Sequence, residues 1–184
     1  MKATGIVRRI DDLGRVVIPK EIRRTMRIRE GDPLEIYTDR EGEVIFKKYS
    51  PIGELTSFAA QYAETLHKTC SMAVVICDRD AVVASAGVSK KEYADRKLSD
   101  ALEGVMEGRS LYVAPASGDK FSPIADGGSH YVSCAMPIVS EGDVVGCVAS
   151  LADNENDVPH DLLGDVEGKL IMTAASFLGK QLES

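Results

Sequence analysis

One stretch decides the fold of the first part of the chain: Gly14-Arg15-Val16-Val17-Ile18-Pro19-Lys20-Glu21-Ile22-Arg23-Arg24-Thr25-Met26. Residues 15–18 predict a short strand that is apolar on both faces. Pro19 fits the first position of a helix, where its missing N–H has no helical partner to lose. Ile22 and Met26 lie four residues apart, so they share one face of a helix that is barely two turns long. Such a short helix is not stable by itself, and the stretch therefore needs apolar cover from elsewhere.

The same stretch belongs to a strongly basic segment. Eight cations form this basic patch: Lys2, Arg8, Arg9, Arg15, Lys20, Arg23, Arg24 and Arg27. One interpretation is a solvated surface whose arginines pair with Asp11, Asp12 or Glu21, because exposed ion pairs are common and weak. So many cations in one segment favour the other interpretation, an anion-binding surface with nucleic acid as its partner.

The distribution of charge indicates two roles in one chain. The 184 residues have a formal net charge of −7, which alone argues against nucleic acid as a partner. Residues 1–50 hold 12 Lys and Arg against 9 Asp and Glu, whereas residues 51–184 hold 10 against 20. The basic residues 1–50, called the head below, should therefore be attracted to DNA. The acidic residues 51–184, the body, should be repelled by it.

The segment Ala3–Pro19, continued by Glu21–Arg24, resembles the AbrB-type transition-state regulators of spore-forming bacteria. The resemblance extends without a gap over about the first fifty residues and includes unusual residue choices. The chain length matches an arrangement in this family in which the AbrB-type domain precedes a C-terminal GAF domain. The resemblance implies a DNA-binding transcription regulator that both activates and represses late, forespore-stage sporulation genes.

In the AbrB-type family, matching arginines bind double-stranded DNA. Carried over by position, they are Arg8, Arg15, Arg23 and Arg24. Proximity alone adds four auxiliary candidates, which are Lys2, Arg9, Lys20 and Arg27. Arginine can hold phosphate through two hydrogen bonds and can also read guanine edges. A dimer with this many arginines should read groove shape as well as bases.

The head is too small to be stable alone. A unit of about 50 residues without disulfide or metal is marginal, because it buries too little of its surface. Residues 16–18 need cover on both faces, and a second copy of the chain is the simplest cover. The resemblance implies the same, since AbrB-type domains are swapped-hairpin dimers with interleaved strands. Two-fold symmetry would place two arginine clusters on one face of the dimer.

The content of β-branched residues and the alternation of apolar with polar residues predict three further strands in the head. They are Lys2–Ile10, Leu34–Thr38 and Val44–Lys48. Ser50 suits a helix cap and Pro51 a first helical position, so the boundary falls there. The predicted domains are a DNA-binding domain, residues 1–50, and a sensor or assembly domain, residues 51–184.

The second domain predicts an α+β fold, with an antiparallel sheet and helices packed against it. In order, the expected elements are a helix over 52–68, a hairpin of 72–77 with 81–86, helices over 89–106 broken near Ser99, a strand at 111–114, a hairpin of 130–139 with 144–151, and a helix over 158–182. Ser89-Lys90-Lys91-Glu92 has the pattern of a capping box. The order resembles the GAF sensor fold, which implies a sensing or assembly role.

The irregular stretch Pro115–Gly128 suggests a small-molecule pocket. Loops of this length inside a domain are usually functional or disordered. One interpretation is a roof over a ligand pocket, with Asp126, Ser129 and His130 as its polar groups and an unknown ligand. The other is a mobile loop over a filled core. The two have equal support from the sequence.

The last helix predicts a second contact between chains. Its expected buried side is Leu162, Leu163, Val166, Leu170, Ala174, Phe177 and Leu178. Gly164, Gly168, Ala175 and Gly179 fall near one stripe, and glycine inside a helix calls for a reason. Close approach to the 52–66 helix of the same chain, or to a partner chain, would supply one. A homotetramer built from head dimers and helix contacts follows, and the resemblance also implies a tetramer.

Catalysis, cofactors and metals have little support in the sequence. Some GAF proteins reduce methionine sulfoxide with cysteine thiolates, which would make Cys70, Cys77 or Cys134 candidates. A reactive cysteine needs exposure and a cationic neighbour, and Cys77 and Cys134 lie in apolar strands. The pattern of Cys134 and Cys147 favours core packing. The three histidines lack zinc-type spacing, so no metal, cofactor or enzyme activity is expected.

Two alternatives remain within the DNA-binding class: an AbrB-type global transition-state regulator, and an antitoxin-like autorepressor. Antitoxins usually carry a disordered toxin-binding tail, whereas residues 51–184 are apolar and periodic. A sequence without a signal peptide or a segment long enough to span a bilayer is expected to be cytoplasmic.

Overall fold

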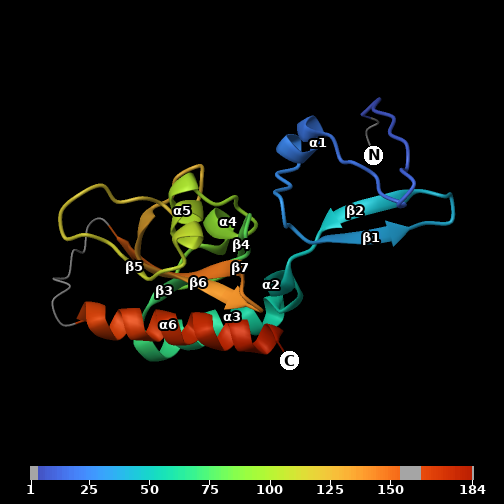
Figure 1. The fold of residues 1–184 in the computed structure, drawn as a ribbon. Helices are drawn as coiled ribbons and strands as arrows, with labels where there is room; N and C mark the ends of the chain where they lie inside the picture. Colours follow the sequence, from blue (N-terminus) through green and yellow to red (C-terminus); the bar gives the residue numbers. More distant parts are fainter. Residues whose placement is uncertain (1–3, 154–162, 184) are drawn as a thin grey trace. The chain divides into compact units, whose positions relative to one another are not determined.

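The computed structural model describes residues 4–153 and 163–183 of the chain. The chain divides into two compact units, Met1–Tyr49 and Ser50–Ser184. Figure 1 shows both units along the chain.

The N-terminal unit consists of one short helix and one hairpin. Helix α1 spans Lys20–Thr25, and strands β1 (Leu34–Thr38) and β2 (Val44–Lys48) pair antiparallel from Leu34↔Lys48 to Thr38↔Val44. The Asp39 carboxylate accepts hydrogen bonds from the N–H groups of Glu41 and Glu43, both at 2.9 Å. Gly42 then supplies the positive φ of +83° that this turn needs. The predicted hairpin is confirmed.

The predicted strands before α1 are wrong for the single chain. Residues 4–10 and 15–19 have no regular secondary structure. A strand needs a neighbour to pair its N–H and C=O groups, and within the described residues of one chain these segments have none. Pro19 occupies the cap position, one residue before its predicted place. Met26, a predicted anchor, is 58% exposed, because nothing in the unit covers it.

Most large apolar side chains of the N-terminal unit face solvent in the single chain. The exposed set comprises Ile6, Val7, Ile10, Leu13, Val16, Val17, Met26, Ile36, Tyr37, Val44 and Phe46. Val7 reaches 87% and Val17 70% exposed. This much uncovered apolar surface on a small unit is typical of an interaction surface.

The second unit is a five-stranded antiparallel sheet with the strand order β4-β3-β7-β6-β5. Its strands are β3 (Ala73–Cys77), β4 (Val82–Ala86), β5 (Tyr112–Val113), β6 (His130–Ser140) and β7 (Asp143–Asp153). Its helices are α2 (Pro51–Glu54), α3 (Thr56–Cys70), α4 (Lys90–Tyr93), α5 (Asp100–Gly108) and α6 (Leu163–Leu182). The predicted α+β class, the two hairpins and the break near Ser99 are confirmed.

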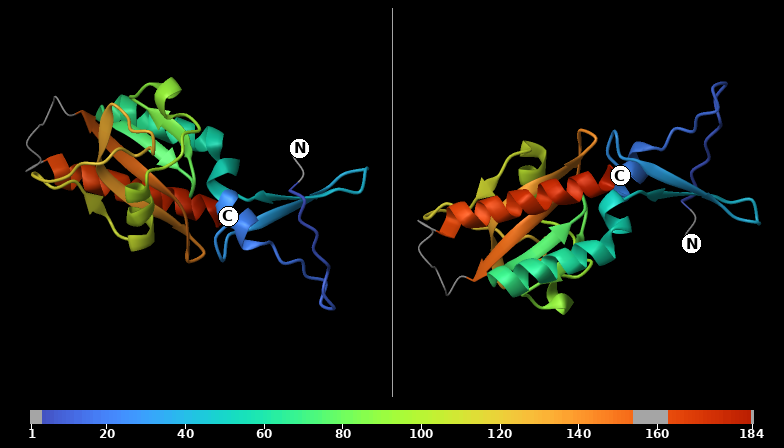
Figure 2. Two further views of the ribbon diagram at one scale, coloured as in Figure 1. Left: turned by 90° about the horizontal axis from the view of Figure 1, so that it is seen from above. Right: turned by 90° about the horizontal axis from the view of Figure 1, so that it is seen from below.

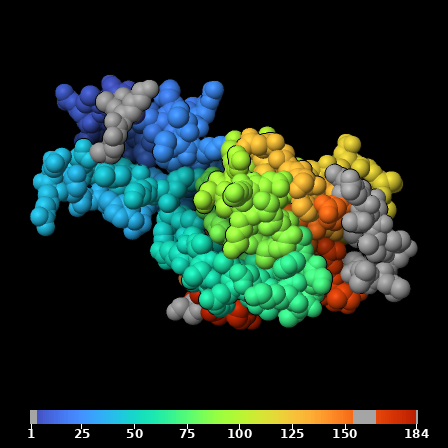
Figure 3. Space-filling model, turned by 180° about the vertical axis from the view of Figure 1, so that it is seen from behind, coloured from blue at the N-terminus to red at the C-terminus, as the bar shows by residue number. Residues whose placement is uncertain are grey.

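Two core layers cover the two faces of this sheet. Alternate residues of β3 supply them, since side chains of a strand point to opposite faces. Val74 and Ile76 pack in the layer that holds α3 and α6, whereas Val75 and Cys77 pack in the layer that holds α5. Figure 2 shows α3 (teal) and α6 (red) side by side on one face. On the side drawn in Figure 3, the surface of this unit comes largely from the segment that runs from α3 to α4, both included (teal to light green).

Serine caps begin two of the helices, of which the sequence predicted the cap at Ser50. The Ser50 hydroxyl accepts from the N–H of Gly53 at 3.0 Å and donates to the Asp78 carboxylate at 2.9 Å. Ser99 accepts from the N–H of Leu102 at 3.3 Å. The predicted capping box at α4 is not formed, because Ser89 makes no side-chain cap and the Glu92 carboxylate bonds to Ser129 instead.

The stretch Pro115–Gly128 is irregular but attached to the unit over its second half. Ser99 N–H donates to the Pro123 carbonyl at 3.0 Å, and Val132 N–H donates to the Phe121 carbonyl at 2.9 Å. Leu98 and Ile124 form an isolated antiparallel bridge. Residues 121–124 therefore pack against the unit, with Ile124 in the core, whereas residues 115–119 and 125–127 are exposed.

Helix α6 buries Ala174 and Leu178 as predicted, but the rest of its buried stripe differs from the prediction. Ile171, Ala174, Ala175 and Leu178 are buried, whereas Val166 is 55% and Phe177 41% exposed. The residues that would begin the predicted helix, 158–162, lie outside the described part of the chain. The helix covers one sheet face with a narrow strip of small and branched residues, and this leaves its aromatic residue at the surface.

Gly179 of α6 approaches the sheet and not another helix. A methyl group built on Gly179 would overlap the carbonyl oxygen of Val139 in β6. At Gly168 the same methyl group would lie 3.4 Å from the Leu111 side chain, which is an ordinary contact. The predicted helix–helix approach is thus wrong for Gly179, whose missing side chain lets the helix rest on strand β6.

Candidate nucleic-acid interface

A closed turn presents Arg15, the first arginine of the predicted DNA-binding stretch. The main chain closes it through Asp11 N–H to the Arg15 carbonyl and Gly14 N–H to the Asp11 carbonyl, both at 3.0 Å. One oxygen of the Asp11 carboxylate accepts from the N–H groups of Leu13 at 3.0 Å and Arg15 at 2.8 Å. Asp11 therefore fixes its own carboxylate inside the turn.

The second carboxylate oxygen of Asp11 holds the arginine side chain. Arg15 Nε lies 2.8 Å from Asp11 Oδ2, while the Arg15 side chain is 69% exposed. The Arg15 backbone N–H and its guanidinium together hold the pKa of the Asp11 carboxyl below its usual value. The surface ion pair that the sequence offered as an alternative thus exists at Arg15, and Asp11 stays charged into the acidic range.

Five other cations of the basic patch have exposed side chains with no ion-pair partner among residues 4–153 and 163–183. They are Arg8, Arg9, Lys20, Arg23 and Arg24. Arg23 and Arg24 lie in the last turn of α1, where their charge complements the helix C-terminus. Cations without acidic neighbours are free to neutralise phosphate, which is the dominant source of affinity for DNA.

The remaining two members of the basic patch differ from these. Lys2 lies outside the described residues. Arg27 is partly buried, has a φ of +52°, and its carbonyl accepts a hydrogen bond from Lys48 Nζ at 3.0 Å. Lys48 also lies 3.7 Å from the Asp32 carboxylate, which accepts from the Arg29 N–H at 2.8 Å. These contacts tie the end of α1 to β2, so Arg27 serves the fold of the unit.

The three polar residues predicted for a ligand pocket are engaged with other parts of the fold. His130 Nε2 lies 3.1 Å from Asp153 Oδ1, and its Nδ1 lies 2.8 Å from the Ser129 hydroxyl. Asp126 pairs with Arg96 at 3.3 Å. Ser129 N–H donates to the Glu92 carboxylate at 2.7 Å, which lowers the pKa of Glu92. The Ser129–Glu92 contact attaches the start of β6 to α4, and the His130–Asp153 contact joins β6 to β7; Glu92 and Asp153 are partners that sequence reasoning missed.

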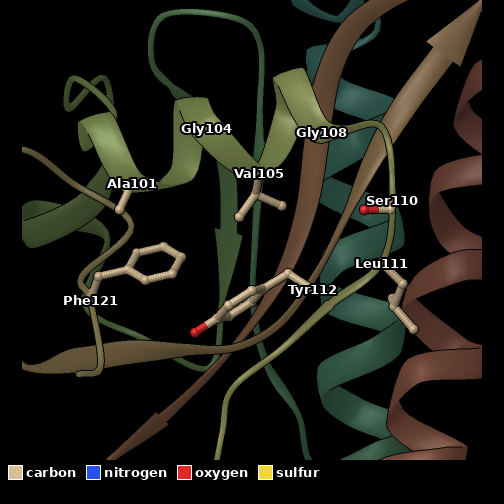
Figure 4. Close-up of a pocket in the computed structure, with 8 residues that line it drawn as sticks. All are labelled: Ala101, Gly104, Val105, Gly108, Ser110, Leu111, Tyr112 and Phe121. Carbon is tan, nitrogen blue, oxygen red and sulfur yellow. The ribbon is translucent and has the colours of Figure 1, made fainter. Parts of the chain in front are cut away.

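A hollow of about 340 Å³ lies elsewhere on the second unit, beside α5. Its lining is formed by Ala101, Gly104, Val105, Gly108, Ser110, Leu111, Tyr112 and Phe121. In Figure 4, Val105 and Tyr112 point toward each other across it, and the rings of Tyr112 and Phe121 lie 5.1 Å apart. Of the stretch Pro115–Gly128, only Phe121 belongs to this lining.

The cysteines of the second unit do not form a reactive group. Cys77, Cys134 and Cys147 are buried, and Cys70 is exposed. Burial raises the pKa of Cys134 and Cys147 to about 12 and that of Cys77 well above its usual value. A neutral thiol is a poor nucleophile, so these three behave as small core residues.

Among the described residues, no group of three or more His, Cys, Asp and Glu side chains is placed to hold a metal ion. Within that same part of the chain, no helix combines the length and apolar character needed to cross a bilayer.

Two family models match the chain, one for each unit. The model described as "Stage V sporulation protein T C-terminal, transcription factor" matches residues 54–183. The model described as "Antidote-toxin recognition MazE, bacterial antitoxin" matches residues 7–53.

Two relatives of Bacillus subtilis and one solved structure extend these matches. The transition state regulatory protein AbrB is 65% identical over 51 residues, which are 28% of this chain and 52% of that protein. A crystal structure of the A. aeolicus nlh2 GAF domain covers 73% of this chain and 85% of its own, with 14% identity and a TM-score of 0.50, and supports the fold alone. Stage V sporulation protein T is 50% identical over 185 residues, which cover 100% of this chain and 99% of that protein. The chain therefore belongs to the stage V sporulation protein T family.

Proposed function

We propose that this protein is a DNA-binding transcription regulator of sporulation, whose N-terminal unit contacts double-stranded DNA. The observation that carries the proposal is the set of exposed, unpaired cations on a unit 65% identical to a transition state regulatory protein. Activation and repression of late, forespore-stage genes in the cytoplasm complete the proposal. The buried thiols support a role without catalysis.

Footprinting of the full chain across sporulation promoters, at several salt concentrations, tests this function. Protected sites should appear at some promoters and weaken as salt rises, because phosphate contacts release counterions. Uniform absence of protection at low salt, with the protein folded, would contradict it.

We further propose that the N-terminal unit acts as a dimer. The support is its uncovered apolar surface, in which Val7, Val17 and Leu13 are each at least 70% exposed. A second copy would cover this surface and supply partners for residues 4–10 and 15–19, which lack strand pairing in one chain. The resemblance to swapped-hairpin dimers points in the same direction.

The second proposed contact, which would complete a homotetramer, lies on the outer faces of α3 and α6. The Phe177 ring lies 5.6 Å from Tyr62 and 5.8 Å from Phe58, and these three rings form an aromatic cluster at the surface. Phe177 is 41% exposed and Val166 on the same helix 55%. Aromatic residues of this kind are enriched at the centres of protein interfaces.

A charge placed in the aromatic cluster should break the tetramer. Phe177→Asp is expected to convert the full chain from tetramer to dimer, because a desolvated carboxylate has no partner there. Ser176→Asp adds the same charge to the neighbouring exposed position and is the matched control. Sedimentation velocity over a concentration series reads the result, and a Phe177→Asp tetramer as stable as the control would contradict this contact.

An antitoxin-like autorepressor is the alternative for the N-terminal unit, favoured by the match of residues 7–53 to an antitoxin model. The second unit argues against an antitoxin, because it folds around two packed core layers and not as an extended tail.

A small-molecule role for the second unit rests on the hollow beside α5. A thermal-shift screen of metabolites on the full chain tests that role.

A further inference from the structure

We propose that Asp11 is a positioning residue for DNA recognition, which holds Arg15 so that its two terminal nitrogens face outward as a paired donor for guanine. The inference rests on the proposed function, because it assigns a division of labour within the same interface. Arg15 would read a base, whereas the unpaired arginines would grip phosphate.

The position of Asp11 is set by contacts within its own turn. Its carboxylate accepts two backbone N–H groups, those of Leu13 and Arg15, at 3.0 and 2.8 Å. Gly14 adopts a φ of +77°, which lets the chain reverse so that Asp11 and Arg15 face each other. The acceptor is therefore fixed before DNA arrives, which lowers the entropic cost of ordering the arginine.

The contact uses only one of the three guanidinium nitrogens. Nε of Arg15 donates to Asp11 Oδ2 at 2.8 Å, and in the described part of the chain Nη1 and Nη2 have no partner. A guanidinium is planar, so fixing Nε orients the other two nitrogens as a pair. Two parallel N–H donors match the O6 and N7 acceptors that guanine presents in the major groove.

Charge decides between guanine and phosphate as the partner of Arg15. The Asp11–Arg15 pair is neutral as a whole, so it releases few counterions when DNA binds. A phosphate beside Arg15 would also lie near the Asp11 carboxylate, and the like charges would repel. The edge of guanine carries no net charge and meets no such repulsion. Arg23 and Arg24 have no acidic partner within the described residues, so they suit phosphate.

A pair of asparagine variants separates positioning from simple charge. Asp11→Asn keeps a carbonyl oxygen for the two backbone N–H groups but can present an amide N–H to Arg15 Nε, which cannot accept. Asp12→Asn removes the same charge from the neighbouring residue, whose side chain is exposed and has no hydrogen bond or ion pair with the described residues. Both variants lessen repulsion with DNA equally, and only Asp11→Asn releases Arg15.

The measurement compares a selected duplex with non-specific DNA, using the full chain. A duplex enriched by the wild-type protein from a random-sequence library serves as the specific probe, and poly(dA-dT) as the non-specific one. Asp11→Asn should bind the selected duplex about tenfold more weakly, which corresponds to the loss of one bidentate base contact. It should bind poly(dA-dT) more tightly, and by at least as much as Asp12→Asn, because the released Arg15 can then neutralise phosphate.

Replacing the guanines of the selected duplex by 7-deazaguanine identifies the contacted atom. This substitution removes N7 and should weaken the wild type and Asp12→Asn, but neither Asp11→Asn nor Arg15→Ala. Arg15→Met keeps the length of the side chain and the backbone N–H of the turn yet has no side-chain donor, so it should also lose sensitivity to 7-deazaguanine. This variant tests the idea even where Asp11→Asn fails to fold.

Equal behaviour of the two asparagine variants on both probes, with normal thermal stability, would overturn the inference. Undiminished sensitivity of Arg15→Met to 7-deazaguanine would do the same. These outcomes leave the proposed function intact, because the wild type still binds DNA. A wild-type protein that enriches no duplex from the library would instead overturn the proposed function.

Discussion

A variant with alanine at both Arg23 and Arg24 is expected to bind duplex DNA about 30-fold more weakly than the wild type at 0.15 M salt. Each lost phosphate contact lowers the slope of log K against log salt by about 0.9, so two contacts lower it by about 1.8 per bound chain. Extrapolated to 1 M salt, the affinities of the two proteins should converge. Fluorescence anisotropy across a salt series measures both the slope and the intercept.

The control for this variant is Arg40→Ala. Arg40 lies in the exposed turn between β1 and β2, in the same unit but outside the basic patch. Its removal changes the net charge of the unit without removing a proposed contact, so the salt slope should stay near that of the wild type. Parallel salt plots for wild type and the double variant, with both proteins folded, would refute the proposed contacts of Arg23 and Arg24.

The contrast between the two units explains how much of the fold the sequence predicts. In the second unit every predicted strand finds its neighbour within the same chain, as in the register His130↔Asp153 to Ser140↔Asp143 of β6 and β7. In such a unit, the local alternation of apolar and polar residues and the turn residues are sufficient to predict the strands. In the N-terminal unit the apolar residues Val16 and Val17 remain exposed, and residues 4–153 and 163–183 offer no strand beside them.

Helix α6 shows a limit of periodicity as a guide to burial. Phe177 and Leu178 both belong to the apolar half of the helix, and only the packing of the sheet determines that Leu178 is buried and Phe177 is not. The glycine at position 179 was a recognisable signal of close approach. Its neighbour, the Val139 carbonyl, is 40 positions earlier in the chain and could be found only from the structure.

Family resemblance identifies the residues of the candidate interface, whereas the structure shows which of their side chains are paired. Spacing cannot distinguish Arg15, which is paired, from Arg23 and Arg24, which are not. One signal was present in the sequence, because an aspartate at the start of a turn commonly accepts the backbone N–H of the residue two positions later. Asp11 accepts that N–H from Leu13 and also the N–H of Arg15, four positions later. The side chain at that fourth position is Arg15, which is why the pair forms.

Substitution of Gly179 by alanine is expected to lower the free energy of unfolding of the second unit by about 1–3 kcal/mol, as overpacking does in a well-packed core. The added methyl group would overlap the carbonyl oxygen of Val139, and a main-chain atom in a paired strand cannot move aside cheaply. Gly168→Ala in the same helix is the matched comparison. Its methyl group would meet only the Leu111 side chain at 3.4 Å, so the gain in helix propensity, about 0.5–1 kcal/mol, should appear as stabilisation. Urea unfolding of both full-chain variants measures whether each substitution raises or lowers the free energy of unfolding. Both are measured at the same protein concentration, because assembly contributes to stability. A Gly179→Ala protein as stable as Gly168→Ala would mean that α6 does not rest on β6 in solution, and the account of its glycines would have to be abandoned.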